Sequence, residues 1–135
     1  FAGLKGLLPP PSKRGLVLID PPYEDKNDYR NVISALKDSQ RRFPNGVYAL
    51  WYPLIPREES KDLGRRLKAL SPNNYLHAQL CVQAEQGSHG MYGSAMFVIN
   101  PPWQLNAQLQ EVMPVLQTLL ANDESKPFVL DAVIA

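Results

Sequence analysis

Residues 16–23 read Leu-Val-Leu-Ile-Asp-Pro-Pro-Tyr, and this stretch indicates both the fold and the chemistry of the chain. Its four apolar residues do not alternate with polar ones, which is typical of a strand that is covered on both faces, as in a parallel sheet. Open sheets of this class bind their ligands outside the carboxyl ends of the parallel strands. We therefore expect Asp20 and the residues after it to lie at the binding edge of an open α/β sheet.

The residue types after this strand suit the exocyclic amino group of a planar base. The Asp20 carboxylate and the Pro21 carbonyl can each accept one N–H of an amine. The prolines hold the turn in place, and neither has a backbone N–H that would compete. Tyr23 can stack on a base that has left its helical stack. The pattern favours methylation of an amino group, and the alternative is that Asp-Pro-Pro is only a turn after a strand.

Helices and strands alternate along the rest of the chain, which is the pattern of an open α/β sheet in a single domain over 1–135. The expected helices cover 29–43, 57–70 and a stretch from Gln104 onward, and the expected strands cover 47–52, 75–83, 94–99 and 128–134. Asp28 is the expected N-cap of the first helix. Pro114 removes a backbone donor from the last helix, so we expect a kink or a break there.

Apolar and polar residues alternate over 75–83. This pattern predicts a strand near the edge of the sheet with Tyr75, His77 and Gln79 on its more exposed face.

A second segment of similar composition, Asn100-Pro101-Pro102-Trp103, follows the strand 94–99. If this strand returns antiparallel to 75–83, its end lies at the opposite edge of the sheet, and we interpret the segment as structural. The same geometry places the Gly90–Ser94 loop at the binding edge, as a contact or as a simple connection. Trp51, Tyr52 and Pro53 end a neighbouring parallel strand, where they either wall the base pocket or only pack.

Composition sets limits on the class of protein. Hydrophobic residues make up 44% and charged residues 20% of the chain, and the net charge is +1. The basic clusters permit RNA binding without arguing for it, because acids are interleaved with them. Cys81 is alone, and His77 and His89 have no neighbours at ligand spacing, so we expect no disulfide within one chain and no metal site. We find no signal peptide and no apolar run of roughly 20 residues that would indicate a membrane, and a cytoplasmic setting fits best.

Three segments of the chain resemble the RlmJ-type 23S ribosomal RNA adenine-N6 methyltransferases. They are Arg-Gly-Leu-Val-Leu-Ile-Asp-Pro-Pro-Tyr-Glu at 14–24, Tyr-Ala-Leu-Trp-Tyr-Pro at 48–53 and Ser-Ala-Met-Phe-Val-Ile-Asn-Pro-Pro-Trp at 94–103. The resemblance implies a Rossmann-like class I methyltransferase sheet, mostly parallel with one antiparallel strand. It also implies S-adenosyl-L-methionine as the cofactor and 23S ribosomal RNA as the partner.

The resemblance also implies roles for the residues of the first segment. Asp20 carries over as the catalytic acid that binds the amine, receives its proton and lies against the methyl donor. Pro21, Pro22 and Tyr23 carry over as the rest of the catalytic base clamp.

The family's Gly-rich loop and acidic strand ends, which hold the donor, have no counterpart in this sequence. We therefore expect the chain to be the C-terminal half of such a domain, beginning at its fourth strand and inactive alone. Two alternatives stay open: an amino-methyltransferase that acts on DNA or on guanine, and a non-catalytic module that binds nucleic acid or a partner. Replacing Asp20 by Ala would abolish methyl transfer by an enzyme and leave the function of such a module intact. The sequence does not indicate the oligomeric state.

Overall fold

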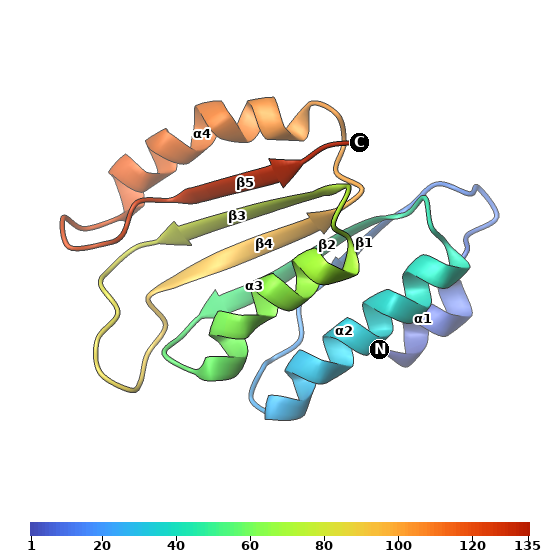
Figure 1. The fold of residues 1–135 in the computed structure, drawn as a ribbon, viewed down its shortest axis with the longest axis horizontal. Coiled ribbons are helices and arrows are strands. Elements are labelled where there is room, and N and C mark those ends of the chain that lie inside the picture. The colour runs from blue at the N-terminus through green and yellow to red at the C-terminus, as the bar shows by residue number, and fades with distance from the viewer.

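The computed structural model describes residues 1–135 and shows a five-stranded sheet with helices on both faces (Figure 1). In chain order the elements are α1 (Ala2–Leu7), β1 (Leu16–Ile19), α2 (Lys26–Arg42), β2 (Val47–Leu54), α3 (Glu58–Leu70), β3 (Tyr75–Cys81), β4 (Gly93–Ile99), α4 (Leu105–Leu120) and β5 (Val129–Val133). The strands lie in the order β1-β2-β4-β3-β5. Helices α1, α2 and α3 lie on one side of the sheet, and α4 lies on the other.

The sheet is more mixed than we predicted. β1 and β2 are parallel, and β4 runs antiparallel to both β2 and β3, as expected. β5 is also antiparallel to β3, so two strands oppose the others, and the prediction of one was wrong. The cause is the direction of α4, whose C-terminal end meets the end of β3 through a bond from Asn122 N to Val82 O. The chain therefore enters β5 at the carboxyl end of β3 and must run back along it.

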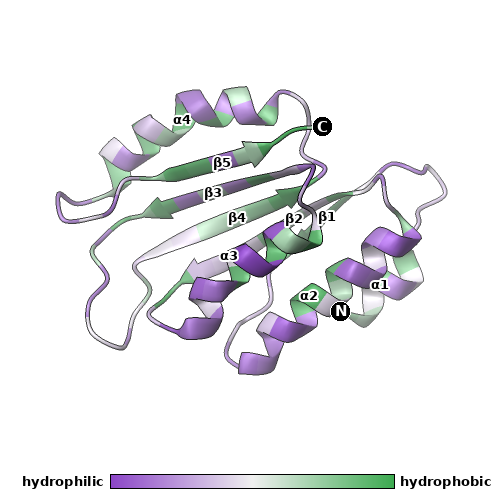
Figure 2. Ribbon diagram, viewed as in Figure 1, coloured by the Kyte–Doolittle hydropathy of each residue, from purple (hydrophilic) through white to green (hydrophobic).

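The larger core lies between α2, α3 and the sheet. Fully buried side chains from the helices meet fully buried aromatic rings from the strands; they include Tyr29, Leu36, Leu63, Leu67, Tyr48, Tyr52 and Phe97. Polar residues occupy the outward turns of these helices (Figure 2). Asp25, and not Asp28, caps α2, because Asp25 Oδ1 accepts a bond of 2.8 Å from Asn27 N. The helix therefore begins three residues earlier than predicted.

Both faces of β3 are covered, contrary to the prediction from its alternating sequence. Tyr75 is 7% and His77 is 3% exposed, and His77 Nε2 lies 2.7 Å from the Tyr52 hydroxyl. Helix α3 can approach this closely because residue 64 is glycine: a Cβ there would lie 2.9 Å from His77 Cε1. The polar side chains of Tyr75 and His77 are therefore inside the protein and not in water, and His77 is bonded there through Nε2 while its Nδ1 has no partner.

Helix α4 covers only part of its face of the sheet. It continues from Leu105 to Leu120 through Pro114, so of the kink or break that we expected there, a break does not occur. Towards the other end of the sheet, β1 pairs with β2 alone, and Leu16 and Leu18 are 69% and 68% exposed. β1 is thus an open, apolar edge of the sheet. No helix of the protein is long and apolar enough to cross a membrane.

Candidate active site

The segment Asp20–Tyr23 leaves the sheet at the carboxyl end of β1, as predicted from the sequence. Ile19 pairs with Leu50 in the register of β1 and β2, so Asp20 lies beside Trp51. Asp20 is exposed, and its carboxylate forms neither a hydrogen bond nor an ion pair within the chain. An unpaired carboxylate at this edge is free to accept hydrogen bonds from a ligand.

Tyr23 anchors the turn from inside the protein. Its ring is 3% exposed and packs against Tyr29, with ring centroids 4.9 Å apart, and against Trp51 at 6.5 Å. Its hydroxyl donates a bond of 2.8 Å to the Trp51 carbonyl. Burial, together with Tyr29 and Asp20, raises the pKa of Tyr23, so the hydroxyl stays protonated and remains a donor. The ring is not exposed to a base in this structure, which differs from the stacking surface that we expected.

Arg57 holds the same turn from the next helix. Tyr23 has a φ of 56°, in the left-handed region that a tyrosine seldom adopts. Its carbonyl accepts a bond of 3.4 Å from Arg57 Nη1, which reaches over from the N-cap position of α3. Lys26 and Glu59 join the starts of α2 and α3 through an ion pair of 3.4 Å. We did not predict a role for Arg57 from the sequence, although a cation between the end of a strand and the start of a helix was a signal that could have identified it.

Only one of the three residues proposed as a pocket wall reaches this site. Trp51 is partly buried and lies beside Asp20. Tyr52 lies under α3 against His77. Pro53 is buried, and its carbonyl accepts a bond of 2.7 Å from Ser60 Oγ. Trp51 is therefore the aromatic side chain at the site with some exposed surface.

The Gly90–Ser94 loop lies at the same edge of the sheet as Asp20, as predicted. Tyr92 N donates to Leu54 O at 2.9 Å, which fixes the loop to the end of β2. Gly93 is required at the start of β4, because a Cβ there would lie 2.4 Å from Leu80 O. The loop is placed beside the site without contacting Asp20.

The second Pro-Pro segment lies at the opposite edge, as predicted from the strand direction. Ile99 pairs with Tyr48, near the amino end of β2. Asn100 Nδ2 donates to Pro44 O at 2.7 Å and to Gly46 O at 2.8 Å, and its Oδ1 accepts from Asn74 Nδ2 at 3.2 Å. The amide is fully used in joining three loops, which is a structural role.

The sequence of this chain matches the model of a known family over residues 1–129, and that family is described as ribosomal RNA large subunit methyltransferase D, RlmJ. The chain belongs to the RlmJ family. It is 43% identical over 123 residues to the ribosomal RNA large subunit methyltransferase J of Haemophilus influenzae, covering 91% of this chain and 44% of that protein. It is 45% identical over 120 residues to the protein of the same name from Escherichia coli, covering 89% and 43%.

A solved structure shows the same fold. The crystal structure of a protein from Legionella pneumophila strain Philadelphia 1 superposes with a TM-score of 0.86 at 29% identity, covering 98% of this chain and 48% of that one. The chain thus spans less than half the length of each of these three relatives.

The three segments that resemble RlmJ-type enzymes are neighbours in space. Segment 14–24 contains β1, and segment 48–53 contains most of β2; the two strands pair in parallel. Segment 94–103 contains most of β4, which pairs with β2 from the other side. The RlmJ-like sequence therefore forms three adjacent strands, and Asp20 lies at the carboxyl end of the outer one.

Proposed function

We propose that the intact protein transfers a methyl group from S-adenosyl-L-methionine to the N6 amine of an adenosine in 23S ribosomal RNA, and that this chain supplies the target-base half of the site. The observation that carries the proposal is the free carboxylate of Asp20 beside Trp51, in a chain of a ribosomal RNA methyltransferase family. The names of the Haemophilus and Escherichia relatives support a methyltransferase that modifies large-subunit ribosomal RNA.

Asp20 and Pro21 bind the target amine in this proposal. The adenine N6 lone pair is delocalised into the ring, so the amine is a poor nucleophile. The Asp20 carboxylate and the Pro21 carbonyl each accept a hydrogen bond from one of its two N–H groups, which favours a more tetrahedral nitrogen. The new N–C bond forms as the bond between the methyl carbon and the donor sulfur breaks, and the electron pair of the broken bond stays on sulfur. The nitrogen loses one proton, and Asp20 would receive it as the general base.

The buried part of the turn keeps these acceptors in position. Tyr23 is fixed to Trp51 O and to Arg57, so the two residues before it cannot rotate freely. Pro21 and Pro22 restrict the backbone further. Preorganised acceptors of this kind need no reorganisation during the reaction. Tyr23 and Pro22 thus complete the base clamp by holding the acceptors in place.

The residues present fit one side of a bound methyl donor. A groove of about 750 Å³ runs along the open side of β1, between that strand and α1, and Asp20, Pro21 and Pro22 are among its walls. S-adenosyl-L-methionine, when bound, supplies a methyl group on a positively charged sulfur. Asp20 would hold the donor from the end of β1, whose exposed side chains are the apolar Leu16 and Leu18; Arg14 and Asp28 are the other charged residues of the groove. The other contacts come from outside this chain, which on its own is expected to be inactive.

Methylation of ribosomal RNA by the intact protein tests the activity. Unmodified 23S ribosomal RNA is incubated with isotope-labelled S-adenosyl-L-methionine, digested to nucleosides and analysed by mass spectrometry. We expect labelled N6-methyladenosine. Labelled methylguanosine, or faster methylation of a DNA duplex than of the RNA, would contradict the proposed substrate.

Calorimetry tests the division of the site. We expect no binding of S-adenosylhomocysteine to the 135-residue chain and clear binding to the intact protein. Stoichiometric binding to the chain alone would show that the donor pocket lies within it.

A further inference from the structure

The net charge of +1 conceals a separation of charge along the strand direction. Six exposed cations lie at the edge of the sheet opposite Asp20, accompanied by a single acid, Asp38. These cations, which we call the basic patch, are Lys5, Lys13, Arg14, Lys37, Arg41 and Arg42. They come from the end of α1, the loop before β1 and the last turns of α2. The edge that carries Asp20 holds most of the acids of α2, α3 and their loops.

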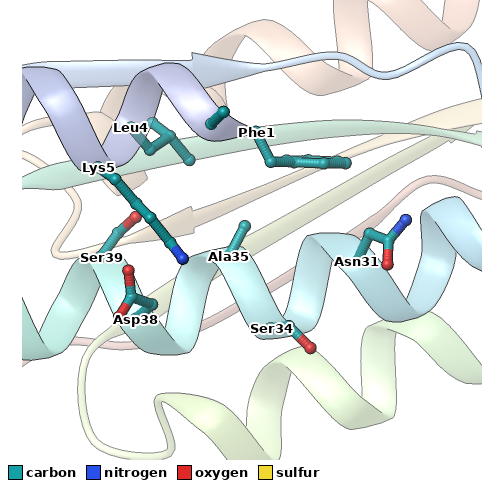
Figure 3. Close-up of a pocket in the computed structure, with 9 residues that line it drawn as sticks. Phe1, Leu4, Lys5, Asn31, Ser34, Ala35, Asp38 and Ser39 are labelled. Atoms are coloured by element: carbon teal, nitrogen blue, oxygen red, sulfur yellow. The ribbon is translucent and has the colours of Figure 1, made fainter.

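Two hydrogen bonds bring the parts of the basic patch together. Arg42 Nη1 donates to the Lys5 carbonyl at 2.9 Å, which joins the ends of α1 and α2. Lys5 extends from α1 across α2 towards Asp38 (Figure 3). Gly15 O accepts from Val47 N at 3.0 Å, so the Lys13–Arg14 loop lies beside the end of α2. The loop and this helix end occupy the same side of the molecule in Figure 1.

Most cations of the basic patch have no ion-pair partner inside the chain. Only Arg42 has an ion-pair partner, Asp38, at 3.1 Å. The other five form no ion pair. By contrast, at the edge that carries Asp20, Lys26 and Lys61 each pair with a glutamate. Uncompensated like charges held together repel one another and attract an anionic polymer.

We propose that the basic patch binds the phosphate backbone of an RNA helix that flanks the target nucleotide. The proposal rests on the proposed function, which makes RNA the polymer. Arg14 and Asp20 are six positions apart along an extended segment, which corresponds to roughly 20 Å. The patch is therefore too far from Asp20 to contact the target base and far enough to contact a neighbouring helix. Phosphate contacts of this kind supply affinity and orientation and no chemistry.

Methylation kinetics of the intact protein at several salt concentrations test the basic patch. The variant Lys37→Gln/Arg41→Gln removes two charges from it, and Arg65→Gln/Lys126→Gln removes two exposed charges elsewhere. We expect the patch variant to raise KM for 23S ribosomal RNA by about tenfold and to keep kcat within about twofold. Its plot of log(kcat/KM) against log salt should be shallower by about one for each lost phosphate contact, whereas the control should match the wild type.

The outcomes separate this proposal from the proposed function. If the wild type methylates ribosomal RNA and both variants keep its KM and salt slope, the basic patch does not bind RNA. If the wild type methylates no RNA, the proposed function fails, and a direct binding measurement then decides whether the basic patch binds RNA. For that measurement we use fluorescence anisotropy with a labelled RNA hairpin of about 16 base pairs. Weaker binding by the patch variant than by the control supports the proposal, and equal binding, or a preference for the same duplex in DNA, overturns it.

Discussion

The segments Asp20–Tyr23 and Asn100–Trp103 have nearly the same composition and opposite uses. Each follows an apolar strand and contains two prolines and an aromatic residue. The Asn100 side-chain amide forms hydrogen bonds with Pro44, Gly46 and Asn74, whereas the Asp20 carboxylate has no partner in the chain. The aromatic residues are reversed as well: Tyr23 is 3% and Trp103 is 82% exposed.

The difference shows that strand direction decides what a motif at a strand end can do. β1 runs parallel to β2 and delivers Asp20 to the edge where open α/β sheets bind ligands. β4 runs the other way and delivers Asn100 to the opposite edge, where β1 and β2 have their amino ends. A free polar group is useful at the first edge, and a fully bonded one stabilises loops at the second.

The largest expected effect belongs to Asp20→Asn. This change keeps the size of the side chain and removes the proton acceptor, so methyl transfer by the intact protein should fall by about a thousandfold. Stability should not change, because the carboxylate has no partner in the chain. Initial rates with 23S ribosomal RNA measure the effect, and Asp123→Asn, an exposed acid elsewhere, is the control. Full activity of Asp20→Asn would show that the base clamp lies elsewhere.

The two aromatic residues should differ most in stability. Tyr23→Ala leaves a cavity beside Tyr29 and removes the bond to Trp51 O, and we expect it to lower the free energy of unfolding by about 3–4 kcal/mol. Trp103→Ala should change it by less than about 0.5 kcal/mol, since its side chain is mostly in water. Urea denaturation measures both values. Similar losses for the two variants would contradict the difference in burial.

Acid should weaken the fold independently of Asp20. Burial, followed by the nearby positive charge of Lys68, lowers the pKa of His77 to about 4, whereas an unfolded histidine has a pKa of about 6.5. The unfolded state therefore binds more protons between these values, so this stabilisation is complete above pH 6.5 and decreases as the pH falls to about 4. The loss should reach about 3 kcal/mol at pH 4.

Denaturation curves at several pH values, with His77→Asn as the control, measure this effect. The pH dependence of the variant should be flatter over that range, and an unchanged profile would mean that His77 does not titrate as proposed.

Asn100→Gly should lose less stability than Tyr23→Ala. Asn100 has a φ of 54°, which glycine adopts freely, so the change removes the amide bonds without adding strain. We expect a loss of about 2 kcal/mol in unfolding free energy and methylation rates close to the wild type. Asn100→Ala adds the cost of the left-handed backbone, about 1 kcal/mol more. A large loss of kcat in Asn100→Gly, with little loss of stability, would contradict a structural role.

The sequence predicted both Pro-Pro segments because their placement follows from strand order and direction. It predicted an exposed face of β3 that is in fact covered, because alternation of apolar and polar residues does not show whether a helix packs on the polar face. Tyr75 and His77 are polar and yet buried: α3 approaches His77 over Gly64, and the Tyr52 hydroxyl lies within bonding distance of His77 Nε2. It also gave Tyr23 an exposed ring, because nothing local shows that the hydroxyl meets Trp51 O, 28 residues away.

What the sequence by itself determined is the run of apolar strands, the acid at the end of the first, and the family. These depend on residues close together in the chain, whose spacing fixes which side chains can share a face or follow a strand. Only the tertiary structure decided which polar groups stay free and which cations gather. Asp20 is unpaired, Tyr23 is locked by Arg57 and Trp51, and the basic patch forms because distant segments meet. Burial and pairing depend on tertiary contacts between distant segments, and the order of residues along the chain does not show which contacts form.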